Sequence, residues 1–221
     1  MMGRPLRVIL VEDEPLFRNL LASTLRHRSE LELLGVFSDG REPIARCLEL
    51  VPDVAILDID LGHEETGFQV GLRLRQHLPD LGVVLLSNYD EPGILSAIPV
   101  GQTHGWSYLL KKSVASIDTV VRAIEGSAAG LMVLDPHLIR ALRPRDNGRL
   151  SHLTPRQKEV LALMAAGYSN HAIAEKLVIT EKSVENQISL VYQNLGVQTG
   201  DGGVHPRVTA TLLYINESHR P

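Results

Sequence analysis

The sequence of 221 residues has little cysteine, no long apolar run and no excess of basic residues. Cys47 is the only cysteine, which excludes an intrachain disulfide framework and a zinc site built from several cysteines. No apolar run approaches the ~18 residues of a membrane-spanning helix, and the first residues form no apolar signal region. A net charge of −4 argues against a protein that coats nucleic acid by charge alone. We therefore expect a cytoplasmic protein that contacts no membrane.

The composition is that of a globular protein, and the charge is distributed unevenly along it. Hydrophobic residues make up 44% of the chain and charged residues 22%, and the length suits one large domain or two ordinary ones. Residues 1–135 carry a net charge of −7, residues 136–150 carry +3, and residues 151–221 are neutral. Three charge regimes predict at least two units joined by a basic connector.

The N-terminal part alternates short apolar runs with longer amphipathic stretches. The apolar runs predict buried strands at Leu6–Val11, Leu31–Phe37, Val54–Leu57, Val83–Leu86 and Tyr108–Leu110. Helical spacing appears at Pro15–Arg26, Glu42–Leu50, Phe68–His77, Pro92–Ile98 and Ser116–Glu125. Regular alternation predicts an α/β doubly wound, five-stranded parallel sheet wrapped by helices. Such sheets place ligand chemistry beyond the carboxyl ends of their strands.

The C-terminal part has a purely helical pattern after a charged connector. A short helix at His137–Leu142 precedes a solvated stretch with Pro, Asn and Gly among charges. Capping residues and glycine stops predict helices at Arg156–Ala166, His171–Leu177, Thr180–Leu195 and Arg207–Ile215, with a turn at Gln198–Pro206. We expect a small all-α domain, so the predicted division is 1–127, a linker with a short helix at 128–149, and 150–221.

Polar side chains follow the predicted strands at the edge where parallel strands end. Glu12 and Asp13 follow the first strand, Asp58 the third, Ser87 the fourth and Lys111 the last. Charged residues commonly end strands because the chain reaches the protein surface there. Five polar residues at the same ends of these strands nevertheless favour a functional site. Clustered carboxylates repel and bind a hard divalent cation, so we expect Mg²⁺ to neutralise an incoming phosphoryl group with Asp58 as nucleophile. The hydroxyl and the ammonium would hold phosphoryl oxygens.

Over residues 5–127 this ordered set resembles the response-regulator receiver domain of two-component signalling, which has a flavodoxin-like fold. Val11-Glu12-Asp13-Glu14-Pro15 is similar to its acidic-pair loop and Tyr108-Leu109-Leu110-Lys111 to its aromatic-plus-lysine signature. Asp58 matches its phosphoacceptor and Ser87 its switch hydroxyl. The resemblance implies phosphotransfer from a sensor histidine kinase and magnesium held by Glu12, Asp13, Asp58 and the backbone carbonyl of Asp60. It also implies that Ser87 and Tyr108 reorient when Asp58 is modified.

The sequence departs from the family pattern at three places. The loop Leu61–Gly67 lacks the usual proline and is one residue longer, and Asn88 stands where a small apolar residue is commoner. The stretch Ile98–His104 breaks the expected fourth helix, which affects the switch surface more than the chemistry.

A phosphatase of the haloacid-dehalogenase type is the alternative from another class. Asp58-Ile59-Asp60-Leu61 after an apolar strand fits its DxDx motif, but Gly62 stands where Thr or Val is usual. That motif follows the first strand of its fold, and Glu12 and Asp13 would have no role. We therefore expect a regulator and not an enzyme, with no catalytic residues of its own.

The helical part resembles the LuxR-type helix-turn-helix over about residues 150–198. The similarity rests on Leu153-Thr154-Pro155-Arg156-Gln157-Lys158-Glu159-Val160-Leu161, Gly167-Tyr168-Ser169-Asn170, Glu181-Lys182-Ser183-Val184-Glu185-Asn186 and Leu195-Gly196-Val197. A receiver followed by this output is the arrangement of NarL/FixJ-type response regulators. The resemblance implies a phosphorylation-controlled transcriptional regulator that binds double-stranded promoter DNA as a homodimer.

The third helix of this domain has one apolar and one polar face. Val184, Ile188, Val191 and Leu195 repeat at four, three and four residues and should face the core. The outer face carries Lys182, Glu185, Asn186, Ser189 and Gln193. Asn186 and Gln187 would read base edges, and Lys182 and Ser183 would suit phosphates.

This polar face is less basic than the resemblance implies. Glu185 and Gln187 stand where the family normally carries a Lys or Arg and a His, and a carboxylate repels phosphates although it accepts hydrogen bonds from cytosine. An ordinary solvated helix face is one alternative. A helical output domain that docks protein instead of DNA is the other, and the salt dependence of binding distinguishes it.

Overall fold

The computed structural model describes residues 4–62, 65–89, 94, 97–99, 102–114, 116–141, 148–197 and 205–219. The chain divides into two compact units, the first of residues 1–89 and 105–130, the second of residues 90–104 and 131–221. The predicted division at 127 and 149 stays a prediction, and residues 142–147 of that linker lie outside the described part. Within the described part, no helix is long and apolar enough to cross a membrane.

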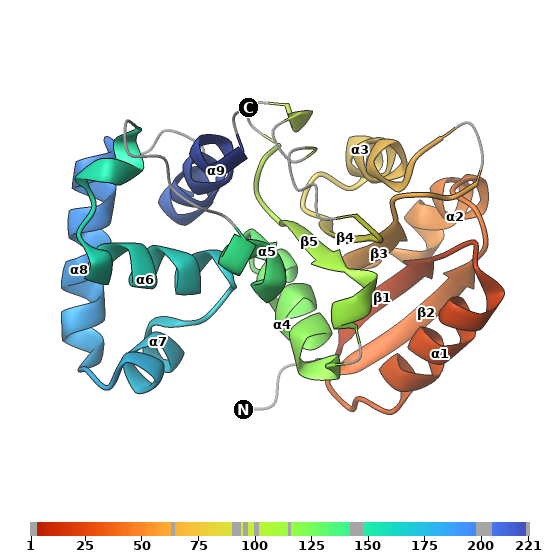
Figure 1. Ribbon diagram of the computed structural model, residues 1–221. Helices are drawn as coiled ribbons and strands as arrows, with labels where there is room; N and C mark the ends of the chain where they lie inside the picture. Colours follow the sequence, from red (N-terminus) through yellow and green to blue (C-terminus); the bar gives the residue numbers. More distant parts are fainter. Residues whose placement is uncertain are drawn as a thin grey trace. The chain divides into compact units, whose positions relative to one another are not determined.

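The first unit is built on a parallel sheet (Figure 1). Its strands are β1 (Leu6–Val11), β2 (Leu31–Phe37), β3 (Val54–Asp58), β4 (Gly82–Ser87) and β5 (Trp106–Leu110). All five predicted strands are therefore confirmed. Every residue of β3, β4 and β5 is buried, as expected for continuous apolar runs covered on both faces of a parallel sheet.

The predicted strand count is one too low. The sheet has six strands in the order β2-β1-β3-β4-β5-β6, and β6 (Val133–Leu134) lies in the stretch that the sequence assigned to the linker. Two residues are too few to show an alternating or continuous apolar pattern, so sequence periodicity gives no signal for β6.

Four helices cover the sheet of the first unit: α1 (Pro15–Arg26), α2 (Arg41–Leu50), α3 (Gly67–His77) and α4 (Ile117–Ala128). In Figure 1, α1 and α4 lie on one face and α2 and α3 on the other. The strand order explains why α1 lies opposite α2 and α3, because the crossover from β1 to β2 runs along the sheet in the opposite direction to those from β2 to β3 and from β3 to β4. The predicted helix Pro92–Ile98 falls largely on residues outside the described ranges.

The core of the first unit contains the chain's only tryptophan. Trp106 is fully buried, with the Phe68 ring centroid 5.3 Å from its own and the Arg75 guanidinium 5.8 Å from its ring. Cys47 is also buried in this unit. Both residues pack in the core, and the tryptophan is a natural reporter of this unit alone.

The second unit is helical after β6. It contains α5 (Pro136–Ala141), the 3₁₀ turn η3 (Arg149–His152), α6 (Pro155–Ala165), α7 (Asn170–Leu177), α8 (Glu181–Leu195) and α9 (Pro206–His219). Hydroxyls of Thr154, Ser169 and Thr180 cap α6, α7 and α8, as the sequence predicted. The turn at Gln198–Pro206 lies mostly outside the described residues.

The helix α8 packs as its periodicity predicts. Val184, Ile188, Val191 and Leu195 are its buried residues, and α8 contacts α6, α7 and α9. The predicted core face is therefore confirmed, and the opposite face is left to solvent.

Candidate functional site

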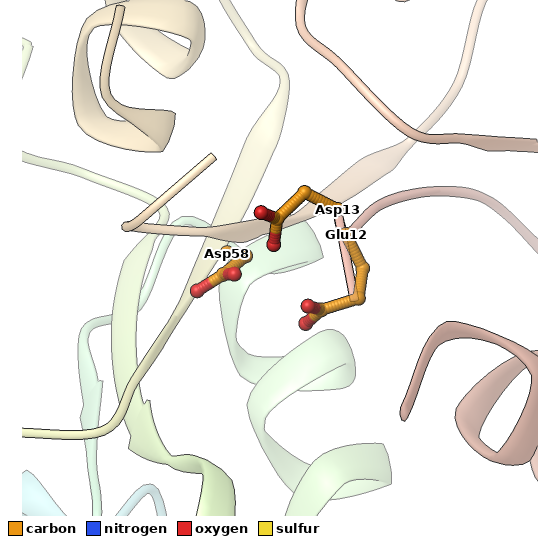
Figure 2. Close-up of side chains that lie close together, drawn as sticks. All are labelled: Glu12, Asp13 and Asp58. Atoms are coloured by element: carbon orange, nitrogen blue, oxygen red, sulfur yellow. The ribbon is translucent and has the colours of Figure 1, made fainter. Parts of the chain in front are cut away.

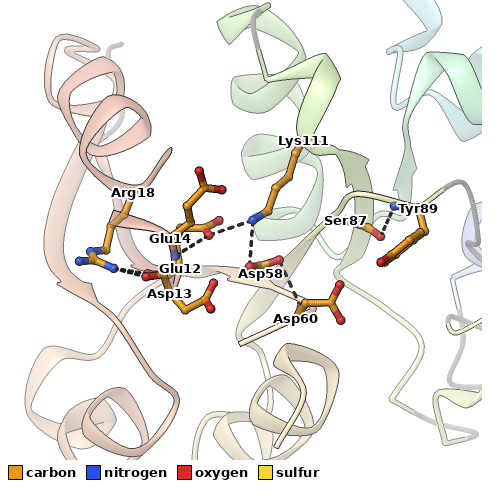
Figure 3. Close-up of polar contacts among 9 residues, drawn as sticks. All are labelled: Glu12, Asp13, Glu14, Arg18, Asp58, Asp60, Ser87, Tyr89 and Lys111. Atoms are coloured by element: carbon orange, nitrogen blue, oxygen red, sulfur yellow. Dashed lines mark hydrogen bonds and ion pairs between the residues drawn. The ribbon is translucent and has the colours of Figure 1, made fainter. Parts of the chain in front are cut away.

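Three charged side chains meet at the carboxyl end of the sheet (Figure 3). Glu12 follows β1, Asp58 ends β3 and Lys111 follows β5, and parallel pairing brings these ends together. The Lys111 ammonium donates to Glu12 Oε1 at 2.8 Å and to Asp58 Oδ2 at 2.9 Å. The side chains are 0%, 1% and 9% exposed for Glu12, Asp58 and Lys111. The structure thus joins residues that are 99 and 53 positions apart.

The carboxylates of Glu12, Asp13 and Asp58 form a compact cluster (Figure 2). Each offers an oxygen, and these oxygens lie within 4.8 Å of one another. Glu12 Oε2 is buried and has no hydrogen-bond partner among the described residues. Asp58 Oδ1 accepts only a long bond of 3.3 Å from the Asp60 amide. A set of carboxylate oxygens with spare acceptor capacity has the donor chemistry that a hard divalent cation prefers.

Burial and charge shift the pKa values of the two central groups. Burial, joined by the charge of Glu12, raises the pKa of Asp58 to about 7, against the opposing hydrogen bond from Lys111. Burial also lowers the pKa of Lys111, but its hydrogen bonds to Glu12 and Asp58 outweigh this, so its pKa is raised. The Asp58 carboxylate therefore depends on nearby positive charge to stay ionised at neutral pH.

The start of α1 holds the acidic loop in place. Arg18 donates to the main-chain oxygens of Glu12 at 2.7 Å and of Asp13 at 2.9 Å, and the Glu14 amide donates to Glu12 Oε1 at 3.1 Å. The Phe17 ring lies 4.9 Å from the Lys111 ammonium. Sequence reasoning missed Phe17 and Arg18. The signal was Pro15 at the first helical position, which places both residues in the first turn above the loop.

Gly67, at the start of α3, packs directly against the Asp58 backbone. A Cβ at this position would lie 1.9 Å from the Asp58 carbonyl oxygen, and the Gly67 amide donates to Ile59 at 3.0 Å. Only glycine allows this approach, so it fixes the depth at which α3 sits below the Asp58 loop. The sequence showed this glycine only as the end of the long loop.

Ser87 and Tyr108 are linked through the backbone of Tyr89. The Tyr89 amide donates to Ser87 Oγ at 3.0 Å, and the Tyr108 hydroxyl donates to the Tyr89 carbonyl at 2.7 Å. Both Ser87 and Tyr108 are buried, and Figure 3 shows Ser87 on the strand beside Asp58. A movement of either side chain therefore acts on the backbone of the same residue, Tyr89. Sequence reasoning did not assign Tyr89, whose contribution is main-chain.

The outer face of α8 carries the residues predicted to contact DNA. Lys182, Glu185, Asn186 and Ser189 are exposed, and Ser183 and Gln187 are half-buried. The Lys182 ammonium donates to Glu185 Oε2 at 3.0 Å, and the Ser189 hydroxyl donates to the Glu185 main-chain oxygen at 3.0 Å. The structure places all six residues on one helix, with a carboxylate in the middle of the exposed face.

Several basic side chains of the second unit already have partners within it. Arg156 donates to the Leu177 main-chain oxygen at 2.9 Å, and Arg207 donates to the Tyr168 main-chain oxygen. The Lys176 ammonium lies 4.5 Å from the Tyr168 ring centroid. These cations hold helices together, which reduces the charge that is available to a polyanion.

Two family descriptions match separate parts of the chain. The response regulator receiver domain matches residues 8–125. The luxR family of bacterial regulatory proteins matches residues 151–200. The two matches coincide with the sheet-based part and with the part that holds α6, α7 and α8.

Curated relatives and solved structures agree with these matches. The response regulator protein VraR of Staphylococcus aureus is 30% identical over 197 residues, covering 87% of this chain and 91% of the relative. A structure of the RcsB response regulator of Salmonella typhimurium has a TM-score of 0.54 at 22% identity, covering 91% of this chain and 97% of that one. A structure of two RcsB dimers bound to two parallel DNAs has a TM-score of 0.53 at 23% identity, with 96% and 98% covered. At these identities the solved structures support the fold.

Proposed function

The chain belongs to the NarL/FixJ-type response regulators, with a receiver domain and a LuxR-type output domain, and we propose that its receiver accepts a phosphoryl group on Asp58 from a sensor histidine kinase. One observation supports this assignment above all. Asp58 is a buried carboxylate that shares one ammonium with Glu12, at the sheet edge where parallel folds place their chemistry. The protein would then act as a regulator controlled by this modification and not as an enzyme.

The transfer uses residues that already lie around Asp58. A carboxylate oxygen of Asp58 attacks the phosphorus of a phosphohistidine, an acyl phosphate forms, and the P–N bond breaks with its electron pair returning to the imidazole nitrogen. Lys111, 2.9 Å from Asp58 Oδ2, is placed to follow the new phosphoryl oxygens. The Ser87 hydroxyl at the end of β4 supplies a further donor and carries the change to Tyr89 and Tyr108.

Magnesium fits the donor set of this pocket. Glu12, Asp13, Asp58 and the backbone carbonyl of Asp60 would hold it, and the unpartnered Glu12 Oε2 is the observation that favours an ion. When bound, Mg²⁺ neutralises the charge that develops on the phosphoryl oxygens.

Incubation with acetyl phosphate and magnesium tests the assignment by intact-protein mass spectrometry. We expect the mass to rise by one phosphoryl group, and Asp58→Asn to abolish the gain. Asp60→Asn is the matched control, because its side chain is exposed and lies two residues away. A label that survives in Asp58→Asn contradicts the proposal.

The output that we propose is promoter binding by α8 in the major groove, as a homodimer formed on phosphorylation in the cytoplasm. The support is the exposed polar face of α8 opposite a fully packed apolar face. The RcsB structure with DNA shows that a protein of this fold reaches DNA as a dimer. Selection of bound sequences from a random DNA library, with and without phosphorylation, tests this directly. Failure to enrich any sequence at low salt contradicts it.

Docking of a protein partner is the second candidate for the output, and the charge of α7 and α8 favours it. These two helices contain two lysines, three glutamates and no arginine. Affinity for DNA falls steeply with salt because counterions are released from phosphates. A binding partner whose affinity changes little between low and high salt would therefore identify the protein-docking output.

A further inference from the structure

The recognition surface of the second unit is unusually poor in net positive charge. Across α7 and α8 the three glutamates outnumber the two lysines, and Arg156 and Arg207 hold main-chain oxygens. Charge neutralisation of phosphates supplies the sequence-independent part of DNA affinity. On this surface that part is small, so discrimination between sequences depends on the groups that reach base edges.

Glu185 lies in the middle of that surface with one oxygen committed and one available. Lys182 Nζ holds Oε2 at 3.0 Å, across one helical turn. Among the described residues no donor reaches Oε1. The Glu185 side chain is 51% exposed and the Lys182 side chain 79%. The ion pair therefore orients the carboxylate along the exposed face of α8.

A fixed carboxylate distinguishes the four bases by their donors and acceptors. In the major groove cytosine presents the N4 amino donor, guanine presents two acceptors, and thymine presents an acceptor and a methyl group. Adenine presents its amino donor beside the N7 acceptor, and this acceptor repels an anion. We propose that Glu185, oriented by Lys182, selects cytosine at one position of the DNA site, an inference that rests on the proposed binding of α8 to DNA.

The ion pair alone does not make this assignment, because the same pair occurs elsewhere in the unit. Arg156 and Glu159 form an equivalent pair on α6, three residues apart at 2.9 Å. The difference is location: Glu185 is next to Asn186 on the outer face of α8, whereas Glu159 is on α6. Glu159→Gln is therefore a matched control that removes the same charge from the same kind of pair.

Sequence selection with the full-length phosphorylated chain tests the proposal. Wild type should enrich sites with one invariant cytosine. Changing this base to thymine should weaken binding about tenfold, the discrimination of one good contact. Glu185→Gln should lose the cytosine and favour adenine, which glutamine pairs at two points. Glu159→Gln should enrich the wild-type sites.

The outcomes separate this inference from the proposed function. If Glu185→Gln enriches the same cytosine, or if wild type enriches sites without an invariant cytosine, the proposed role of Glu185 is refuted while the proposed DNA binding is supported. If no variant enriches any sequence, DNA binding itself is wrong and this inference with it.

Lys182 is a positioning residue in this scheme, and its variant gives a second readout. Lys182→Gln frees Glu185 and removes one phosphate-seeking charge. We expect the preference for cytosine over thymine to fall by about threefold or more. The slope of log binding constant against log salt concentration should become shallower by about one unit, because one fewer phosphate is neutralised. A shallower slope with an unchanged cytosine preference would overturn the orienting role.

Discussion

The two units use charge in opposite ways. In the receiver, Glu12 and Asp58 are removed from solvent and both accept hydrogen bonds from the buried Lys111 ammonium. On α8 of the second unit, Lys182 and Glu185 form an ion pair of similar length, 3.0 Å, that lies in solvent. Distance alone therefore does not tell what an ion pair does.

Burial decides which property each pair controls. A buried charge without its partner is costly, so the receiver cluster couples stability, proton binding and phosphoryl chemistry. A solvated pair contributes little to folding, typically well under ~1 kcal/mol. The Lys182–Glu185 pair on α8 can therefore be broken or replaced with little change in folding stability. Four pairs of substitutions, each with one site in either unit, test this contrast.

Replacing Lys111 should have the largest effect on stability. Lys111→Met leaves two buried carboxylates facing each other and should destabilise the receiver by about 3–5 kcal/mol. Urea unfolding followed by Trp106 fluorescence measures this, because the only tryptophan is buried in that unit. Lys182→Met, followed by hydrogen exchange of α8, should cost less than ~1 kcal/mol. Equal costs would refute the contrast.

Two glycines give the next comparison. Gly67→Ala drives a Cβ into the Asp58 carbonyl and should cost about 1–3 kcal/mol while slowing phosphorylation by acetyl phosphate. Gly196 follows the last residue of α8 with a positive φ of 67°, and a Cβ added there would meet no atom within 4 Å. Gly196→Ala should therefore lower the stability of the second unit by about 1 kcal/mol, through backbone strain alone. Gly67→Ala with normal phosphorylation would show that the Asp58 loop tolerates displacement.

The raised pKa of Asp58 predicts that Asp58→Asn stabilises the receiver by an amount that depends on pH. Between the ordinary pKa of 3.8 and about 7, the folded chain keeps a proton on Asp58 that the unfolded chain releases. Wild-type stability therefore falls as pH rises through this window, and asparagine removes that fall. We expect the advantage of Asp58→Asn to grow by about 2–3 kcal/mol from pH 5 to pH 8, because one pKa unit corresponds to about 1.4 kcal/mol.

Thermal unfolding at several pH values, followed by Trp106 fluorescence in the absence of magnesium, measures this advantage. Glu185→Gln, followed by hydrogen exchange of α8 at the same pH values, is the control in the second unit, where the carboxylate is half exposed. An advantage of Asp58→Asn that is constant with pH would show that Asp58 stays ionised throughout.

The smallest effect should come from two valines in the left-handed region. Val178, after α7, has φ of 53° and is 90% exposed, and Val51, after α2, has φ of 41° and is 48% exposed. Glycine relieves the backbone strain at both, but the more buried valine loses more packing. Val178→Gly should stabilise its unit by about 0.5–1 kcal/mol, and Val51→Gly by less, by hydrogen exchange. A loss of stability in Val178→Gly would reveal a packing role for this side chain.

Much of the receiver follows from sequence alone, for a physical reason. Continuous apolar runs form buried parallel strands, and parallel strands bring their carboxyl ends to one edge, so the meeting of Glu12, Asp58 and Lys111 was predictable. The packed face of α8 was equally readable, because a period of four, three and four residues fits only one side of a helix.

Contacts that depend on close approach or on main-chain groups were not predictable. The Tyr89 backbone groups that link Ser87 to Tyr108, and the approach of Gly67 to Asp58, leave no periodic trace in the sequence. The strand β6 was missed because two residues carry no period. The spacing of Lys182 and Glu185 is a known pairing distance on helices, but only the structure shows which oxygen remains available.

The separation of 99 positions between Glu12 and its ammonium partner Lys111 also has a consequence for protein synthesis. The ribosome releases the chain from its N-terminus, so both acidic strands emerge well before Lys111 does. Until then β1 and β3 end in two carboxylates that cannot be buried without a cation. Nascent receiver therefore bonds both carboxylates to their native ammonium partner only after Lys111 leaves the exit tunnel, and before that a bound cation such as Mg²⁺ is needed to bury them.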